Sequence, residues 1–133
     1  MKPPYSRTVF DLICEQAEID PSRIVAIDAG ASLTYRQLVE RSSRVAMRLR
    51  KNGVRRGDRV GLLSDNRAEW LEIFFAAAAL GAIVVPFSTW STASELEFLL
   101  NDSEVRWLFT IDRFGEQVFT DAIVSDISAH GTN

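Results

Sequence analysis

Residues 67–87 read RAEWLEIFFAAAALGAIVVPF, and this stretch decides the fold class. Its first part, from about Arg67 to Leu80, is long enough for a helix, and Gly81 is the residue type that most often ends one. The β-branched run Ile83–Val85, closed by Pro86, predicts a strand. The second half of the helix is apolar on almost every face, so we expect it to be buried on every face, as in part of a larger fold.

Strand and helix patterns alternate outward from this stretch in both directions. Toward the N-terminus, Thr34 with Gln37 matches a capping box that opens a helix running to about Asn52. Toward the C-terminus, Thr92 with Glu95 forms a second capping box before a short helix. The other expected elements are a helix at Val9–Ala17, strands at Ile24–Ile27, Arg59–Leu63 and Val105–Thr110, a turn at 28–30, a buried stripe at Leu96, Leu99 and Leu100, and a weaker helix near Phe114.

This alternation predicts an α/β fold, a partial doubly wound parallel sheet with right-handed crossovers. Residues 1–120 form the predicted α/β segment. The polar residues 121–133 are expected to fray, as chain ends often do.

Composition bounds the class of protein. The 133 residues fit one domain, and 47% hydrophobic with 25% charged residues is typical of a globular chain and not of a disordered one. A single cysteine makes no internal disulfide, and one cysteine with one histidine is too few ligands for a structural zinc site. The net charge of −3 gives no overall attraction to nucleic acid.

Targeting signals are not evident in the sequence. The N-terminus lacks the uninterrupted apolar core of a signal peptide. The most apolar run, Ile73–Phe87, is shorter than the roughly 20 residues of a membrane-spanning helix. We therefore expect a soluble, cytoplasmic protein with no membrane span, and the lone Cys14 agrees with a reducing compartment.

Phosphate-binding loops are missing from the sequence. A P-loop requires a lysine after a glycine, and the only lysines, Lys2 and Lys51, do not follow one. Gly53, Gly57 and Gly61 are spaced four apart, which does not match the dinucleotide fingerprint. We interpret them as a helix stop, a turn and a tight strand position.

Side chains suited to catalysis are few, and we assign no catalytic, cofactor-binding or metal-binding residue. Cys14 falls in the first predicted helix, where a buried and inert thiol is the ordinary interpretation. His130 lies in the polar tail, too far along the chain to pair with it without a fold-back. Two carboxylate pairs have no pattern specific to catalysis: Glu69 with Glu72, and Glu95 with Glu97.

Two features remain as candidates for binding. Nine of the fifteen basic residues lie between Arg36 and Arg59 with only two acidic ones, so this window carries +7 and the remainder −10. Arg41, Arg44, Arg48 and Lys51 form a stripe at helical spacing, either a solvated face or a site for an anionic partner or acidic domain. No aromatic residue lies in this window, which argues against single-stranded nucleic acid. Trp90 follows a predicted strand, either as a loop side chain packed on the next element or as a ligand contact at the edge where α/β sheets bind ligands.

Several segments resemble the adenylate-forming superfamily, which includes acyl-CoA synthetases, nonribosomal adenylation domains and luciferases. Leu33–Leu38 resembles the first core motif of that family, and Ala78–Phe87 resembles the second. Residues 53–60 are similar to the linker between them, and 92–110 to the helix and strand that follow. The sequence after Pro86, residues 88–92, resembles that of fatty-acid or cyclic-acid CoA ligases more than that of amino-acid adenylation domains.

The resemblance covers about residues 9–117 and implies an ATP-dependent ligase that uses Mg²⁺ and CoA to activate a carboxylic acid. No residue here matches the family's phosphate loop, ribose-binding aspartate or C-terminal lysine, so no catalytic residue carries over. We expect an N-terminal segment of such a ligase, inactive and binding no cofactor alone. We also expect self-association or a complementing ligase fragment as partner. The alternative is a stand-alone α/β binding or protein-interaction module.

Overall fold

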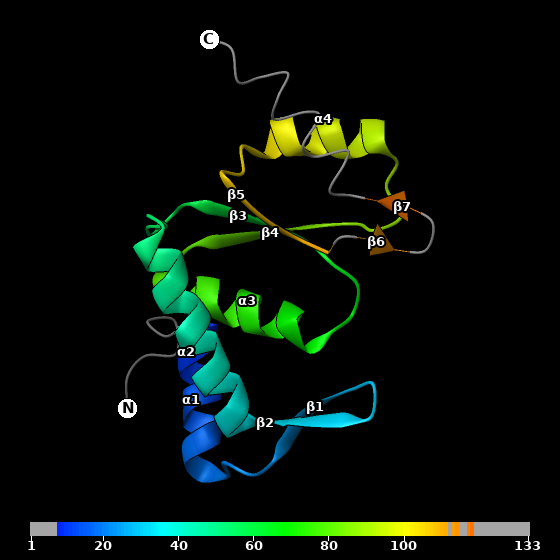
Figure 1. The fold of residues 1–133 in the computed structure, drawn as a ribbon. Coiled ribbons are helices and arrows are strands. Elements are labelled where there is room, and N and C mark those ends of the chain that lie inside the picture. The colour runs from blue at the N-terminus through cyan, green and yellow to red at the C-terminus, as the bar shows by residue number, and fades with distance from the viewer. Residues whose placement is uncertain (1–7, 112, 115–116, 119–133) are drawn as a thin grey trace. The chain divides into compact units, whose positions relative to one another are not determined.

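A computed structural model describes residues 8–111, 113–114 and 117–118 (Figure 1). Its elements are α1 (Val9–Ile19), β1 (Ile24–Asp28), β2 (Ala31–Thr34), α2 (Tyr35–Lys51), β3 (Arg59–Leu63), α3 (Ala68–Leu80), β4 (Ile83–Phe87), α4 (Ala93–Ser103), β5 (Trp107–Thr110), β6 (Arg113–Phe114) and β7 (Gln117–Val118). The chain divides into a first unit, within 1–58 and 66–84, and a second unit, within 59–65 and 85–133.

The first unit contains a hairpin that the sequence did not predict. β1 and β2 pair antiparallel, and their turn places both Ala29 (φ 48°) and Gly30 (φ 83°) in the left-handed region. Two consecutive left-handed residues are typical of tight hairpin turns, because they match the twist of the strands. The predicted turn at 28–30 is therefore confirmed, and it joins two strands where we expected only one.

β2 runs directly into α2 through the predicted capping box. The Thr34 hydroxyl accepts the Gln37 N–H at 3.3 Å, and the Gln37 side-chain oxygen accepts the Thr34 N–H at 3.0 Å. α1 has a capping box of its own, between Thr8 and Asp11, which the sequence reading missed. Both boxes satisfy backbone donors that have no partner within the helix.

The core of the first unit forms where its helices meet the hairpin. Ile13, Leu33 and Leu38 are buried together there. The most extensive packing between helices joins α2 to α3. On α3, Ala76 and Ala77 are fully buried, but Ala79 is exposed and the aromatic residues before it are only half-buried. The described residues alone therefore do not bury this helix on every face, and its burial within a larger fold stays a prediction.

The second unit is built on a three-stranded sheet with strand order β4-β3-β5. β3 and β5 pair in parallel, with Val60 opposite Trp107, which confirms the predicted parallel pairing. Gly61 permits this close approach, since a Cβ there would lie 2.8 Å from Leu108 Cδ1. Pro86 lies within β4, an edge strand of this sheet, where a missing N–H is tolerated.

α4 contributes to the core of the second unit mainly through Leu96, which is buried with Leu63 and Phe87. Leu100 packs against this cluster, whereas Leu99 is 38% exposed, so the predicted three-leucine stripe is only partly correct. The prediction of a helix near Phe114 is wrong. That residue lies in β6, which pairs antiparallel with β7, because local backbone pairing prevails over a weak helical pattern. The tail 121–133, including His130, lies outside the described residues.

Candidate functional site

The loop that follows β4 contains local hydrogen bonds. The Ser88 hydroxyl accepts the Trp90 N–H at 3.2 Å, and the Ser88 carbonyl accepts the Ser91 N–H at 3.2 Å. The capping box of α4 ends the loop, with the Thr92 N–H donated to Glu95 Oε2 at 2.7 Å. These bonds define the backbone of the loop, and Trp90 within it is 83% exposed.

An open hollow of about 550 Å³ lies between this loop and α4. The residues that line it are Ser88, Trp90, Ser91, Ser94, Glu95, Phe98 and Leu99. Phe98 is 67% exposed, so two large aromatic side chains border one hollow whose other lining groups are hydroxyls and a carboxylate. Apolar walls with a few polar groups are typical of surfaces that bind organic molecules or a partner chain.

Glu95 is the ionisable group in this hollow. The Thr92 backbone N–H, and secondarily the Thr92 hydroxyl, donate to its carboxylate and lower its pKa below the ordinary glutamate value. The group is therefore an anion at neutral pH and acts as a helix cap. Glu97, its predicted pair partner, is exposed and does not line the hollow.

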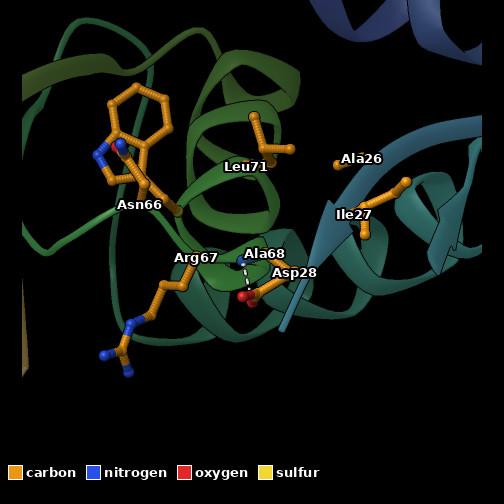
Figure 2. A pocket seen from close by; sticks show the side chains of 8 residues that line it. Ala26, Ile27, Asp28, Asn66, Arg67, Ala68 and Leu71 are labelled. Atoms are coloured by element: carbon orange, nitrogen blue, oxygen red, sulfur yellow. Dashed lines mark hydrogen bonds between the residues drawn. The ribbon is translucent and has the colours of Figure 1, made fainter. Parts of the chain in front are cut away.

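A second hollow, of about 240 Å³, lies in the first unit between the hairpin and the start of α3 (Figure 2). Ala26 and Ile27 border it on the hairpin side, and Leu71 lies opposite on α3. The Asp28 carboxylate accepts the Ala68 N–H at 3.0 Å. Sequence reasoning missed this site because it joins residues 40 positions apart.

The other sequence candidates have structural roles. Burial raises the pKa of the Cys14 thiol, and the charges of Asp11 and Glu18 raise it further, so the thiol is protonated at neutral pH. Glu72 pairs with Arg41 at 3.2 Å, whereas Glu69 is exposed.

Gly53 and Gly57 have positive φ angles of 96° and 85°, as a helix stop and a turn require. In the described part of the chain, no group of three or more His, Cys, Asp or Glu residues is placed to hold a metal ion. None of the described helices combines the length and apolar character needed to cross a bilayer.

Comparison with known proteins decides the family. The model of the AMP-binding enzyme family matches residues 13–132. The chain belongs to this family. The match contains both segments that resemble its core motifs, Leu33–Leu38 and Ala78–Phe87.

Relatives within the AMP-binding family include ligases that join acids to CoA or to an acyl carrier protein. The 2-succinylbenzoate–CoA ligase of Oceanobacillus iheyensis is 34% identical over 115 residues, which are 86% of this chain and 24% of the ligase. The fatty acid–[acyl-carrier-protein] ligase ScoC of Streptomyces coeruleorubidus is 35% identical over 115 residues, 86% of this chain and 22% of that protein. The chain thus spans about a quarter of the length of these relatives.

A solved structure shares the fold. The anthranilate–CoA ligase AuaEII in complex with anthranoyl-AMP is 29% identical and superposes with a TM-score of 0.81, over 92% of this chain and 23% of that one. The AMP-binding family comprises ATP-dependent ligases, and this chain corresponds to their N-terminal part.

Proposed function

We propose that this chain is the N-terminal part of a cytoplasmic acid–CoA ligase. The whole ligase converts a carboxylic acid and ATP, with Mg²⁺, to an acyl-AMP and pyrophosphate, and then transfers the acyl group to CoA with release of AMP. This chain alone does neither step. The observation that carries the proposal is the order of the two family motifs, Leu33–Leu38 and Ala78–Phe87, within a match spanning residues 13–132.

The described residues do not fit the phosphates of a nucleotide. Lys51 is exposed in the last turn of α2, and the left-handed glycines that follow, Gly53 and Gly57, precede no helix N-terminus that carries a lysine. Phosphate sites of this kind require backbone N–H groups converging at a helix start, usually with a lysine beside them. We therefore assign these residues no role in phosphate binding or catalysis.

In this proposal the two motifs are scaffold. Leu33–Leu38 ends β2 and begins α2, with Leu33 and Leu38 in the core of the first unit. Ala78–Phe87 ends α3 at Gly81, which is left-handed with φ 72°, and continues into β4. Their side chains set the positions of elements and bear no group that would act on a carboxylic acid.

Thermal unfolding with and without ATP–Mg²⁺ tests the proposal directly. A ligand that binds only the folded state raises the melting temperature, so the isolated chain should show no saturable shift. Acid-dependent ATP–pyrophosphate exchange should also be undetectable, with a full-length ligase of the family as positive control. A saturable shift or exchange above background would contradict the proposal.

A second measurement tests the larger protein. The coding sequence beyond the codon for Asn133 should encode the Ser/Thr/Gly-rich loop and the later ligase motifs, in this or another frame. A fragment carrying them, expressed together with this chain, should bind it and restore exchange activity. A downstream sequence without those motifs would leave the family membership intact but remove the ligase proposal.

The hollow beside α4 favours a second candidate, a binding or interaction module. Trp90 and Phe98 are 83% and 67% exposed at one open site. The probe is a hydrophobic fluorescent dye, with Trp90→Ala and Phe98→Ala compared against Ile83→Ala, which removes an exposed apolar residue elsewhere. Selective loss of dye binding in the two aromatic variants supports a binding surface, and equal binding in all variants contradicts it.

A further inference from the structure

The hollow between the hairpin and the start of α3 combines apolar walls with a single acidic residue (Figure 2). We name it the hairpin hollow, and the residues that line it are Ala26, Ile27, Asp28, Asn66, Arg67, Ala68, Trp70 and Leu71. All of them belong to the first unit. None lies in Leu33–Leu38 or Ala78–Phe87, so a function of this hollow is independent of the ligase proposal.

The walls of the hairpin hollow are fixed by contacts within the chain. Asp28 is the last residue of β1 and pairs with Ala31 across the hairpin. Its Oδ2 accepts the Ala68 N–H at 3.0 Å, which ties the hairpin to α3. The Trp70 ring stacks on that of Phe74, with centroids 5.5 Å apart and 17° between the ring planes. A site that is already formed binds a ligand at a smaller entropy cost.

One oxygen of the Asp28 carboxylate remains unused. Oδ2 accepts the Ala68 N–H, and Oδ1 has no hydrogen-bond partner among the residues that the structure describes. Within the same part of the chain, no ion pair joins this carboxylate to a cation. Arg67 also lines the hollow, but its guanidinium extends away from Asp28 (Figure 2). A half-buried carboxylate with an unused oxygen suits a donor, and a charged donor makes the stronger hydrogen bond.

The size and the walls of the hollow define the rest of a ligand. Its volume is about 240 Å³. Sites for drug-sized molecules occupy about 300–1,000 Å³, and an engineered cavity of roughly 150 Å³ binds benzene. The hairpin hollow therefore has room for one ring with a short arm. Ile27 and Leu71 offer aliphatic contacts from its two sides, and Trp70 offers an aromatic one.

We propose that the hairpin hollow binds a small organic cation, in which a short arm joins one aromatic ring to an ammonium group. The ammonium donates a hydrogen bond to Asp28 Oδ1, and the ring packs against Ile27, Leu71 and Trp70. The face of an indole also attracts cations, which favours the same charge. An anion is the less favoured occupant, because it would meet the Asp28 carboxylate.

Titration with benzylamine, followed by the amide NMR spectrum of the full 133-residue chain, tests the proposal. The amide signals of residues 26–28 and 68–71 should shift saturably, in the millimolar range expected of so small a ligand, and those of α4 should not. Benzyl alcohol keeps the ring and a donor but has no charge, so it should bind about fivefold more weakly or worse. Benzoate has the opposite charge and should cause no saturable shift.

Two variants separate the charge from the apolar wall. Asp28→Asn keeps an oxygen for the Ala68 N–H but removes the charge, so benzylamine should bind about tenfold more weakly and benzyl alcohol should change little. Ile27→Ala truncates a wall residue that is 71% exposed, and both ligands should bind about threefold more weakly or worse. Glu69→Gln and Ile24→Ala are the matched controls, since both residues are exposed on the same elements but do not line the hollow. Both should bind like the parent.

Circular dichroism with thermal melts confirms that each variant is folded. If Asp28→Asn does not fold, the comparison of the three ligands on the parent chain still decides between a cation and an anion. Three results would overturn the proposal. The first is no saturable shift at the hollow with benzylamine. The second is benzoate binding as tight as that of benzylamine, which would assign the hollow to an anion. The third is an unchanged benzylamine affinity in folded Asp28→Asn.

Discussion

Replacing Ser42 with alanine should stabilise this protein. Ser42 lies within α2 and is fully buried, and its hydroxyl has no hydrogen-bond partner among the described residues. A buried polar group without a partner costs about 1–3 kcal/mol, the free energy of its lost hydration. Alanine also favours a helix interior over serine by up to about 0.7 kcal/mol.

Ser43 is the matched control for this substitution. It lies one position along α2, but its hydroxyl donates to the Val39 carbonyl at 2.7 Å. Ser43→Ala therefore gains the same helix propensity and loses a satisfied hydrogen bond worth about 1 kcal/mol. We expect Ser42→Ala to exceed Ser43→Ala by about 2–4 kcal/mol in unfolding free energy.

Urea unfolding followed by circular dichroism measures both variants against the parent chain. A gain of 1 kcal/mol corresponds to a rise in melting temperature of about 3–6 °C for a chain of this size. If Ser42→Ala is no more stable than Ser43→Ala, the Ser42 hydroxyl has a partner, such as a buried water, and the reasoning is wrong.

Three further predictions concern packing, pH and thiol chemistry. Gly61→Ala should lower the unfolding free energy by about 1–3 kcal/mol, because its Cβ would displace the Leu108 side chain; an unchanged urea midpoint would contradict this. The lowered pKa of Glu95 means that its contribution to stability is present above the ordinary glutamate pKa and is lost as pH falls, so the stability difference between the parent and Glu95→Gln should change on acidification. A difference that is constant with pH would show that the Thr92 hydrogen bonds do not matter. The raised pKa of Cys14 predicts slow reaction with a disulfide reagent at pH 8, accelerating as pH rises and on unfolding in urea; a rate equal to that of a free thiol peptide would refute it.

Elements with local signals could be predicted from the sequence. The capping boxes at Thr34 and Thr92 and the helix stop at Gly81 all appear in the structure as expected. Each is formed by residues a few positions apart, so the residues that make the interaction can be recognised directly in the sequence. The position of Trp90 directly after a strand was also predicted, but its 83% exposure was not, because a loop side chain packed on the next element was the ordinary interpretation.

Elements that depend on distant contacts could not be predicted. β2 has one buried residue, Leu33, too little alternation to indicate a strand without its partner β1. Phe114 carries an ambiguous pattern that pairing with β7 resolves as a strand. The exposure of Leu99 and Phe98 depends on how α4 packs, which its own sequence does not specify.

The start of α3 differs from that of the other helices in a way that affects how the protein opens. Its N-cap residue, Arg67, makes no side-chain capping bond, and its first backbone N–H is held by Asp28 of the hairpin. α1, α2 and α4 each begin with a capping box of their own. Amide hydrogen exchange in the first turn of α3 should therefore follow the opening of the hairpin, so that both segments lose protection together as one cooperative unit.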